Sequence, residues 1–146
     1  MRIAIFGTGG VGGYFGGRLA QAGEDVTFVA RGEHLRAIQT YGLRVESLSG
    51  DFVINPAKAT EDLAEAGKVD LVIVGVKAWQ VPQAARAMKP LVETNTTVLP
   101  LQNGVEAVSQ LTAELGAQPV IGGLCKIVSL WWLRVISVTQ ALSLRL

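Results

Sequence analysis

A glycine-rich segment near the amino terminus has the residue types and spacing of a phosphate-binding loop. Gly7, Gly9 and Gly12 follow the pattern G-x-G-x-x-G, between a short apolar run and a helical pattern. In such loops the first glycine permits a tight turn and the second lets a pyrophosphate approach the backbone, while the third lets the helix pack on the sheet. Free N–H groups at the start of the helix then bind the phosphates. We therefore predict a dinucleotide site here; the alternative is an ordinary strand-to-helix turn.

A basic residue follows the second predicted strand. NAD-binding domains usually have Asp or Glu about 20 residues beyond the glycine motif, where the carboxylate accepts hydrogen bonds from the ribose hydroxyls. Here the sequence reads Ala30-Arg31-Gly32, and the carboxylates Glu24 and Asp25 lie at the opposite end of the strand. A guanidinium binds a 2′-phosphate in a bidentate manner. We therefore predict NADPH rather than NADH, with an ordinary surface arginine as the alternative.

The segment Lys77-Ala78-Trp79-Gln80 follows the continuous apolar run at residues 70–76, which is typical of a central parallel strand. Ligands of parallel α/β sheets bind beyond the carboxyl ends of the strands. The Lys77 ammonium group could therefore approach a cofactor or a carboxylate substrate, and a solvated lysine is the alternative. We expect Trp79 to serve in packing.

The segment Gln102-Asn103-Gly104 follows the next predicted strand. The amide of Asn103 could orient a nicotinamide or a substrate carbonyl. Two structural interpretations compete with this role. Asn-Gly is a common hairpin turn, and Asn103 with Glu106 resembles a capping box at the start of a helix. The helical pattern downstream favours the cap over the hairpin.

The composition favours one domain with no general affinity for polyanions. The chain has 146 residues, of which 49% are hydrophobic and seventeen are glycine, as is typical of a tightly turned α/β fold. The net charge of +1 provides no overall attraction to nucleic acid or to an anionic membrane, so any affinity for phosphate must be local. We expect neither as a partner. No signal peptide is apparent, which favours a cytoplasmic protein.

The sequence has one histidine and one cysteine, which excludes a metal cluster built on these residue types. His34 lies in a short polar helix, where we expect it to be solvated. Cys125 cannot form an internal disulfide, which fits a reducing compartment. We expect its thiol to be a small packing group rather than a nucleophile.

Apolar runs alternate with helical patterns along the chain. We expect strands at residues 3–6, 26–30, 70–76, 97–101 and 120–124, and a hairpin or two short strands at 43–47 and 52–54. We expect helices at residues 14–22, 33–40, 81–88 and 105–115, and a short helix that Thr60 caps and Gly67 ends. This alternation predicts an α/β fold, a Rossmann-like doubly wound parallel sheet.

Taken in order, these segments resemble the cofactor domain of the ketopantoate reductase family (2-dehydropantoate 2-reductase), from residue 1 to about residue 128. The Lys-Ala-Trp-Gln and Asn-Gly segments make the resemblance more specific than the glycine motif alone. It implies NADPH-dependent reduction of the 2-ketoacid ketopantoate to pantoate, on the route to pantothenate and coenzyme A. The cofactor-binding residues that it implies are Gly7, Thr8, Gly9, Gly10, Val11, Gly12, Arg31, Lys77, Gln80 and Asn103. Asn103 would also contact the substrate.

The sequence departs from the family after residue 128. Family members are longer, and their second, helical domain supplies a lysine that acts as general acid and a glutamate that binds the substrate. We expect that domain to be absent here, with a truncated chain that contains no catalytic residue and has negligible turnover alone. Residues 129–146 form an atypical apolar tail. We interpret the tail as a shifted reading frame or a truncated gene, or as an extra strand or helix at the sheet edge.

The tail is too short and too charged to be a convincing membrane span. If it is exposed, we expect it to favour self-association. Two other functions stay open. A dinucleotide-sensing module would regulate a partner without catalysis, and the tail would offer its docking surface. A related dehydrogenase would act on a 3-hydroxy acid, although Arg31 and the Lys-Ala-Trp-Gln segment argue against this.

Overall fold

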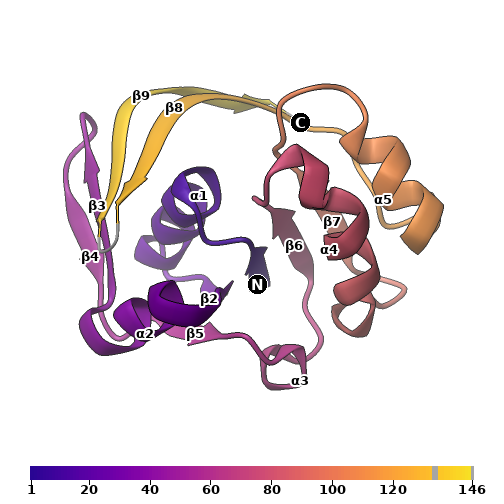
Figure 1. The fold of residues 1–146 in the computed structure, drawn as a ribbon, viewed down its shortest axis with the longest axis horizontal. Helices are drawn as coiled ribbons and strands as arrows, with labels where there is room; N and C mark the ends of the chain where they lie inside the picture. The colour runs from indigo at the N-terminus through magenta and orange to yellow at the C-terminus, as the bar shows by residue number, and fades with distance from the viewer. Residues whose placement is uncertain (133–134, 146) are drawn as a thin grey trace.

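Five parallel strands form the central sheet, and the alternating pattern predicts a parallel sheet with four of these strands. The computed structural model describes residues 1–132 and 135–145, and the side chains of residues 1–128. The strands, in spatial order, are β5 (Lys58–Thr60), β2 (Asp25–Val29), β1 (Arg2–Phe6), β6 (Leu71–Val74) and β7 (Thr97–Pro100) (Figure 1). The chain runs from β1 outward through β2 to β5, and β6 then returns to the other side of β1. The strand order therefore reverses between β1 and β6, where ligands bind in sheets of this type.

Helices cover both faces of this sheet. They are α1 (Gly10–Gln21), α2 (Gly32–Tyr41), α3 (Leu63–Ala66), α4 (Val81–Ala87) and α5 (Ala107–Leu115), with short 3-10 helices η1 (Ala78–Gln80) and η2 (Lys89–Leu91). Side chains of α1 and α2 enter one hydrophobic cluster, and those of α4 and α5 enter a second. This two-sided cover confirms the predicted doubly wound fold.

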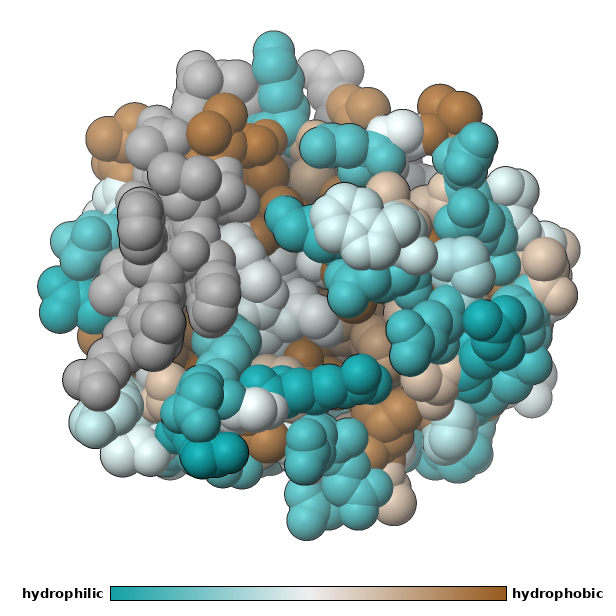
Figure 2. Space-filling view, viewed as in Figure 1, coloured by the Kyte–Doolittle hydropathy of each residue, from teal (hydrophilic) through white to brown (hydrophobic). Residues whose placement is uncertain are grey.

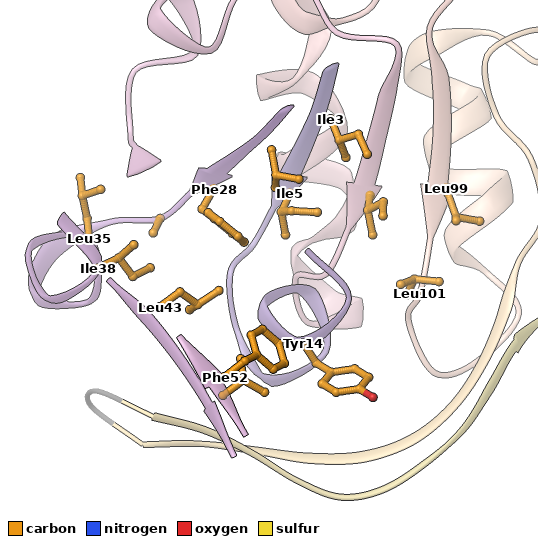
Figure 3. Close-up of a cluster of buried hydrophobic side chains, with 14 residues drawn as sticks. Ile3, Ile5, Tyr14, Phe28, Leu35, Ile38, Leu43, Phe52, Leu99 and Leu101 are labelled. Atoms are coloured by element: carbon orange, nitrogen blue, oxygen red, sulfur yellow. The ribbon is translucent and has the colours of Figure 1, made fainter. Parts of the chain in front are cut away.

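The residues of β1 alternate between the two clusters. Ile3 and Ile5 pack in the cluster that includes Tyr14 of α1 (Figure 3). Ala4 and Phe6 pack in the opposite cluster. Successive side chains of a strand point to opposite faces of the sheet, so a strand that is covered on both faces is apolar at every position. This requirement explains the continuous apolar run that precedes the glycine segment.

A second, four-stranded sheet arches over α1 (Figure 1). The expected hairpin is present, because β3 (Leu43–Ser47) and β4 (Phe52–Ile54) pair antiparallel. β8 (Leu124–Trp132) and β9 (Val135–Arg145) also pair antiparallel, and β9 pairs in parallel with β3. The apolar tail thus contributes strands to this second sheet rather than to an edge of the parallel sheet. β8 begins before residue 129, so it crosses the predicted boundary of the tail.

The expected strand at residues 120–124 is wrong. Within this segment only Val120 pairs with the parallel sheet, through an isolated bridge to Val98 of β7. Gly122 and Gly123 follow, and β8 starts at Leu124. Glycine has no side chain to pack on a sheet and weakens a strand, which explains why the pairing does not continue.

The short helix α3 has a different cap from the one expected. Asp62 is its N-cap, and the Asp62 carboxylate accepts a hydrogen bond from the Ala64 N–H at 2.8 Å. Thr60 instead ends β5, a strand that the sequence pattern did not indicate, and Gly67 ends the helix as expected. β5 has only three residues, too few for a recognisable alternation of apolar and polar positions.

Candidate functional site

A cavity of about 420 Å³ opens at the carboxyl ends of β1, β2 and β6. Phe6, Val29 and Gly75 line it from these three strand ends. The cavity therefore lies at the point where the strand order reverses, the usual ligand position in open α/β sheets. The face of the molecule drawn in Figure 2 is hollowed near its centre, and mainly hydrophilic residues border the hollow.

The glycine segment between β1 and α1 has the geometry that its pattern predicts. Gly7 has a φ of +100°, a conformation that favours glycine. A Cβ on Gly12 would lie 2.2 Å from the Gly7 carbonyl oxygen, so only glycine permits the close contact of α1 with the end of β1. A Cβ on Gly9 would meet no protein atom within 4 Å, and Gly9 lines the cavity. The backbone at Gly9 is thus open to a ligand.

The helix α1 adjoins the cavity through its N-cap, whereas Gly10, Val11 and Gly12 of its first turn are not among the described lining residues. Gly9 is the N-cap and has no side chain to cap the helix, and the first turn contains no acidic residue. The N–H groups of Gly10, Val11 and Gly12 have no partner within the helix. Thr8 is buried, and its hydroxyl donates a hydrogen bond to the Val29 carbonyl at 3.1 Å. The segment is therefore anchored to β2, and the helix start can bind an anion.

Gly75, directly after β6, is a site residue that the sequence analysis missed. A Cβ there would lie 2.7 Å from the Gly7 carbonyl oxygen and 2.9 Å from the Gly12 Cα. The Gly75 N–H also donates to the Phe6 carbonyl at 2.9 Å. Three glycines from two distant segments therefore pack together beside the cavity. The available signal was a glycine near the end of an apolar run, which often marks close approach of two backbones.

Arg31 and His34 border the cavity from the β2 side. Arg31 is the N-cap of α2. The expectation that His34 is solvated is wrong, because its half-buried ring donates from Nε2 to the Thr8 carbonyl. Burial lowers the pKa of His34 below its usual value, although the hydrogen bond to Thr8 opposes this shift. At neutral pH we therefore expect a neutral imidazole with its hydrogen on Nε2.

Lys77 and Gln80 border the cavity from the β6 side, opposite Arg31 across β1. The Gln80 side-chain oxygen accepts a hydrogen bond from the Lys77 N–H at 3.0 Å and closes the η1 turn. Among the side chains that the structure describes, the lining includes the cations of Arg31 and Lys77 and no carboxylate. This charge distribution favours an anionic ligand.

Asn103 lies apart from the first cavity, in a second one of about 510 Å³. Trp79 also lines the second cavity, so the η1 turn borders both cavities. The expectation that Trp79 serves in packing is wrong, because its side chain is 79% exposed. Both structural interpretations of Asn103 are wrong. The chain continues into α5 rather than into a hairpin strand, and α5 begins at Ala107 with Glu106 as an N-cap that makes no side-chain capping bond.

The comparisons with known proteins agree with this architecture. Residues 3–130 match the protein family described as ketopantoate reductase PanE/ApbA. The chain belongs to this family. A 2-dehydropantoate 2-reductase of a Nostoc species is 38% identical over 124 residues. The uncharacterized oxidoreductase YkpB of Bacillus subtilis is 36% identical over 129 residues. The crystal structure of a 2-dehydropantoate 2-reductase from Geobacter metallireducens superposes with a TM-score of 0.89 and 37% identity.

The ketopantoate reductase match covers most of this chain and less than half of each relative. The chain is covered to 85% by the Nostoc relative, to 88% by YkpB and to 94% by the Geobacter structure. The corresponding shares of those proteins are 39%, 42% and 46%. The chain therefore corresponds to the dinucleotide-fold part of these ketopantoate reductase relatives, and the match ends within β8.

Cys125 lies outside both cavities of this ketopantoate reductase domain. Its half-buried thiol contacts the Leu101 carbonyl at 3.6 Å, and burial raises its pKa. Cys125 packs against the hydrophobic cluster that includes Tyr14 of α1, which confirms the expected packing role. Within the described residues no group of His, Cys, Asp and Glu is arranged to hold a metal ion. Every helix described is too short or too polar to cross a bilayer.

Proposed function

We propose that this chain binds NADPH and forms the cofactor half of an enzyme that reduces ketopantoate to pantoate. One observation carries the proposal. The cavity at the reversal point of the sheet combines an open glycine segment with two cations and no carboxylate among the described lining residues. The family match supplies the substrate, since the Nostoc relative is named 2-dehydropantoate 2-reductase.

Each part of such a cofactor has a candidate partner among the described residues. The N–H groups of Gly10, Val11 and Gly12 at the start of α1 would bind the pyrophosphate, which approaches the backbone at Gly9. The Arg31 guanidinium would bind the 2′-phosphate. Lys77 and Gln80 would contact the cofactor further along the cavity.

Asn103 would meet the nicotinamide side and the substrate in the second cavity, which the η1 turn separates from the first. Its amide can donate to a carbonyl oxygen and accept from a carboxamide N–H group. When bound, NADPH would supply the hydride for the ketone carbon. The first cavity would thus hold the cofactor, and the second would hold the 2-ketoacid beside Asn103.

Reduction of a ketone leaves an alkoxide, which needs a positioned proton donor. The family resemblance assigns this role to a lysine, and substrate binding to a glutamate, in a second domain. We propose that residues 1–146 alone bind NADPH with negligible turnover. Calorimetry with NADPH and ketopantoate-dependent NADPH oxidation, both on the purified chain, test the two parts. Heat with NADPH and no oxidation is the expected result.

The two parts fail separately. Robust oxidation by the purified chain would contradict the assignment of the proton donor to another domain. Folded protein that releases no heat with NADPH or NADH would contradict the cofactor site itself. A larger affinity for NADH than for NADPH would remove the role of Arg31.

A further inference from the structure

Gln102 connects the ends of two neighbouring strands. It follows β7, and its half-buried side-chain Nε2 donates two hydrogen bonds. One goes to the Val74 carbonyl at 2.7 Å, at the end of β6, and the other to the Val76 carbonyl at 3.0 Å, two residues further on. Gln102 lines neither of the two cavities. Its side chain therefore contacts the backbone that forms the wall of the first cavity, and not the cavity itself.

The orientation of this amide is set by its partners. Both partners are carbonyl oxygens, which only accept hydrogen bonds, so the NH₂ group must face them. The Gln102 Oε1 atom is then buried without a hydrogen-bond partner among the described residues. An unpaired buried acceptor costs free energy. An apolar side chain of similar length would avoid this cost, but it would leave the Val74 and Val76 carbonyls without these donors.

The two carbonyls flank the part of the backbone that supports the first cavity. Gly75 lies between them and packs on Gly7 and Gly12 of the glycine segment. Lys77 follows Val76 directly, so the Val76 carbonyl belongs to the peptide group that leads into Lys77. The hydrogen bonds of Gln102 therefore set the position from which the Lys77 side chain enters the cavity.

The same residue also adjoins the second cavity, because Asn103 follows it in the chain. Lys77 and Asn103 thus stand on two loops that Gln102 ties together. Arg31 lies beyond β1, on the opposite side of the first cavity. Movement of the β6 end would consequently act on Lys77 and Asn103 directly, and least on Arg31, which follows a strand two places away in the sheet.

We propose that Gln102 is a positioning residue, which holds Lys77 and Asn103 in a fixed relation at the nicotinamide half of the cofactor site. The inference rests on the proposed function, since it assumes that NADPH occupies the cavity. It assigns to Gln102 no contact with the cofactor. It requires that loss of the two donated hydrogen bonds weakens binding of the nicotinamide half and spares the adenosine half.

The test compares two ligands on one variant. Gln102→Met keeps the length of the side chain and removes both donors. NADPH contains both halves of the cofactor, whereas 2′,5′-ADP contains only the adenosine half with its 2′-phosphate. Loss of two hydrogen bonds of ordinary strength should lower the affinity for NADPH roughly tenfold, as measured by calorimetry. The affinity for 2′,5′-ADP should stay at the wild-type value.

Gln118 offers a matched control. Its side-chain Nε2 donates to the Thr94 carbonyl at 2.6 Å, at an exposed position away from both cavities. Gln118→Met should leave NADPH and 2′,5′-ADP affinities unchanged. This control separates a general effect of exchanging glutamine for methionine from the loss of the Gln102 bonds.

A second variant keeps the test open if Gln102→Met does not fold. In Gln102→Glu the carboxylate cannot donate to either carbonyl, but the protonated acid has one O–H donor. NADPH affinity of this variant should rise, relative to wild type, as the pH falls through the carboxyl pKa. A flat ratio to wild type would contradict the proposal.

The outcomes distinguish the two levels of inference. Unchanged NADPH affinity in Gln102→Met, or equal losses for NADPH and 2′,5′-ADP, would overturn the positioning role while the cofactor site stands. If wild-type protein binds neither ligand, the proposed function fails, and the role of Gln102 at a cofactor site fails with it.

Discussion

The imidazole of His34 joins α2 to the glycine segment, because its Nε2 donates to the carbonyl oxygen of Thr8. The ring stands at the rim of the first cavity, three residues after Arg31. A single hydrogen bond thus links the segment proposed for the pyrophosphate to the helix proposed for the 2′-phosphate. Changes in the charge of His34 should therefore affect both parts of the site.

His34 should make the stability of the domain depend on pH. Burial holds its pKa in the folded state below the value of about 6.5 expected for the unfolded chain. The unfolded state then binds the proton more readily, so the free energy of unfolding falls as the pH drops below about 6.5 and levels off below the folded pKa. Above the unfolded pKa of about 6.5 the shift does not change the free energy of unfolding. Urea denaturation across this range measures the change.

His34→Gln is the control for this pH dependence, since an amide N–H can replace the Nε2 donor and does not titrate. The difference in unfolding free energy between wild type and His34→Gln should become less favourable to wild type as the pH falls. Parallel pH profiles for the two proteins would contradict the assignment.

Replacement of Arg31 should change cofactor preference. Arg31→Ala removes a guanidinium at the rim of the cavity, and hydrogen bonds to charged groups contribute about 1.5–3 kcal/mol. NADPH affinity should fall roughly 10- to 100-fold, while NADH affinity should change little. Arg36→Ala, which removes an exposed arginine of the same helix outside the cavity, should affect neither ligand. Calorimetry decides, and equal losses of NADPH and NADH would exclude the 2′-phosphate role.

Two glycines of the same segment should respond differently to alanine. A Cβ on Gly9 would enter open space beside the cavity, so Gly9→Ala should fold normally and bind NADPH more weakly. A Cβ on Gly12 would lie 2.2 Å from the Gly7 carbonyl oxygen, so Gly12→Ala should lose stability. Overpacking of this kind typically costs about 1–3 kcal/mol.

Thermal denaturation and calorimetry on both glycine variants provide the measurement, and each variant is the control for the other. Gly9→Ala that binds NADPH like wild type would show that no ligand approaches this part of the backbone. Gly12→Ala of unchanged stability would contradict the close packing of α1 on β1.

The edge strand β8 of the second sheet should promote self-association. β8 has β9 as its one neighbour in this sheet, and the outward edge of such a strand can pair with another chain. Val128 on β8 is 53% exposed. Lysine on edge strands opposes such pairing, so Val128→Lys should shift the elution of the chain in gel filtration toward the monomer. A wild-type chain that elutes as a monodisperse monomer at high concentration would contradict this prediction.

The candidate site was predictable where one segment contains the whole signal. Gly7, Gly9 and Gly12 lie within six residues, and their roles follow from a turn, an open approach and a close contact, all between adjacent elements. Arg31 and Lys77 were predictable because each follows an apolar run, and the ends of parallel strands share one edge of the sheet. The family match is consistent with this architecture, and the individual binding roles stay predictions.

The positions that the sequence analysis missed all depend on contacts between remote segments. Gly75 needs Gly7 and Gly12 as neighbours, and Gln102 needs the carbonyls at the end of β6 and just beyond it. His34 looked like a residue of a polar helix, and only the docking of α2 brings it to Thr8. None of these pairs has a spacing that repeats or a local pattern that marks it.

Residue order alone was sufficient for the alternation of strands and helices and for the glycine turn, because backbone conformation and side-chain periodicity act over a few residues. The packed fold was needed to bring β6 beside β1, to separate Asn103 from the first cavity, and to pair the tail with β3. These relations depend on which distant strands become neighbours. That choice minimises exposed apolar surface over the whole chain, and no short stretch of sequence contains it.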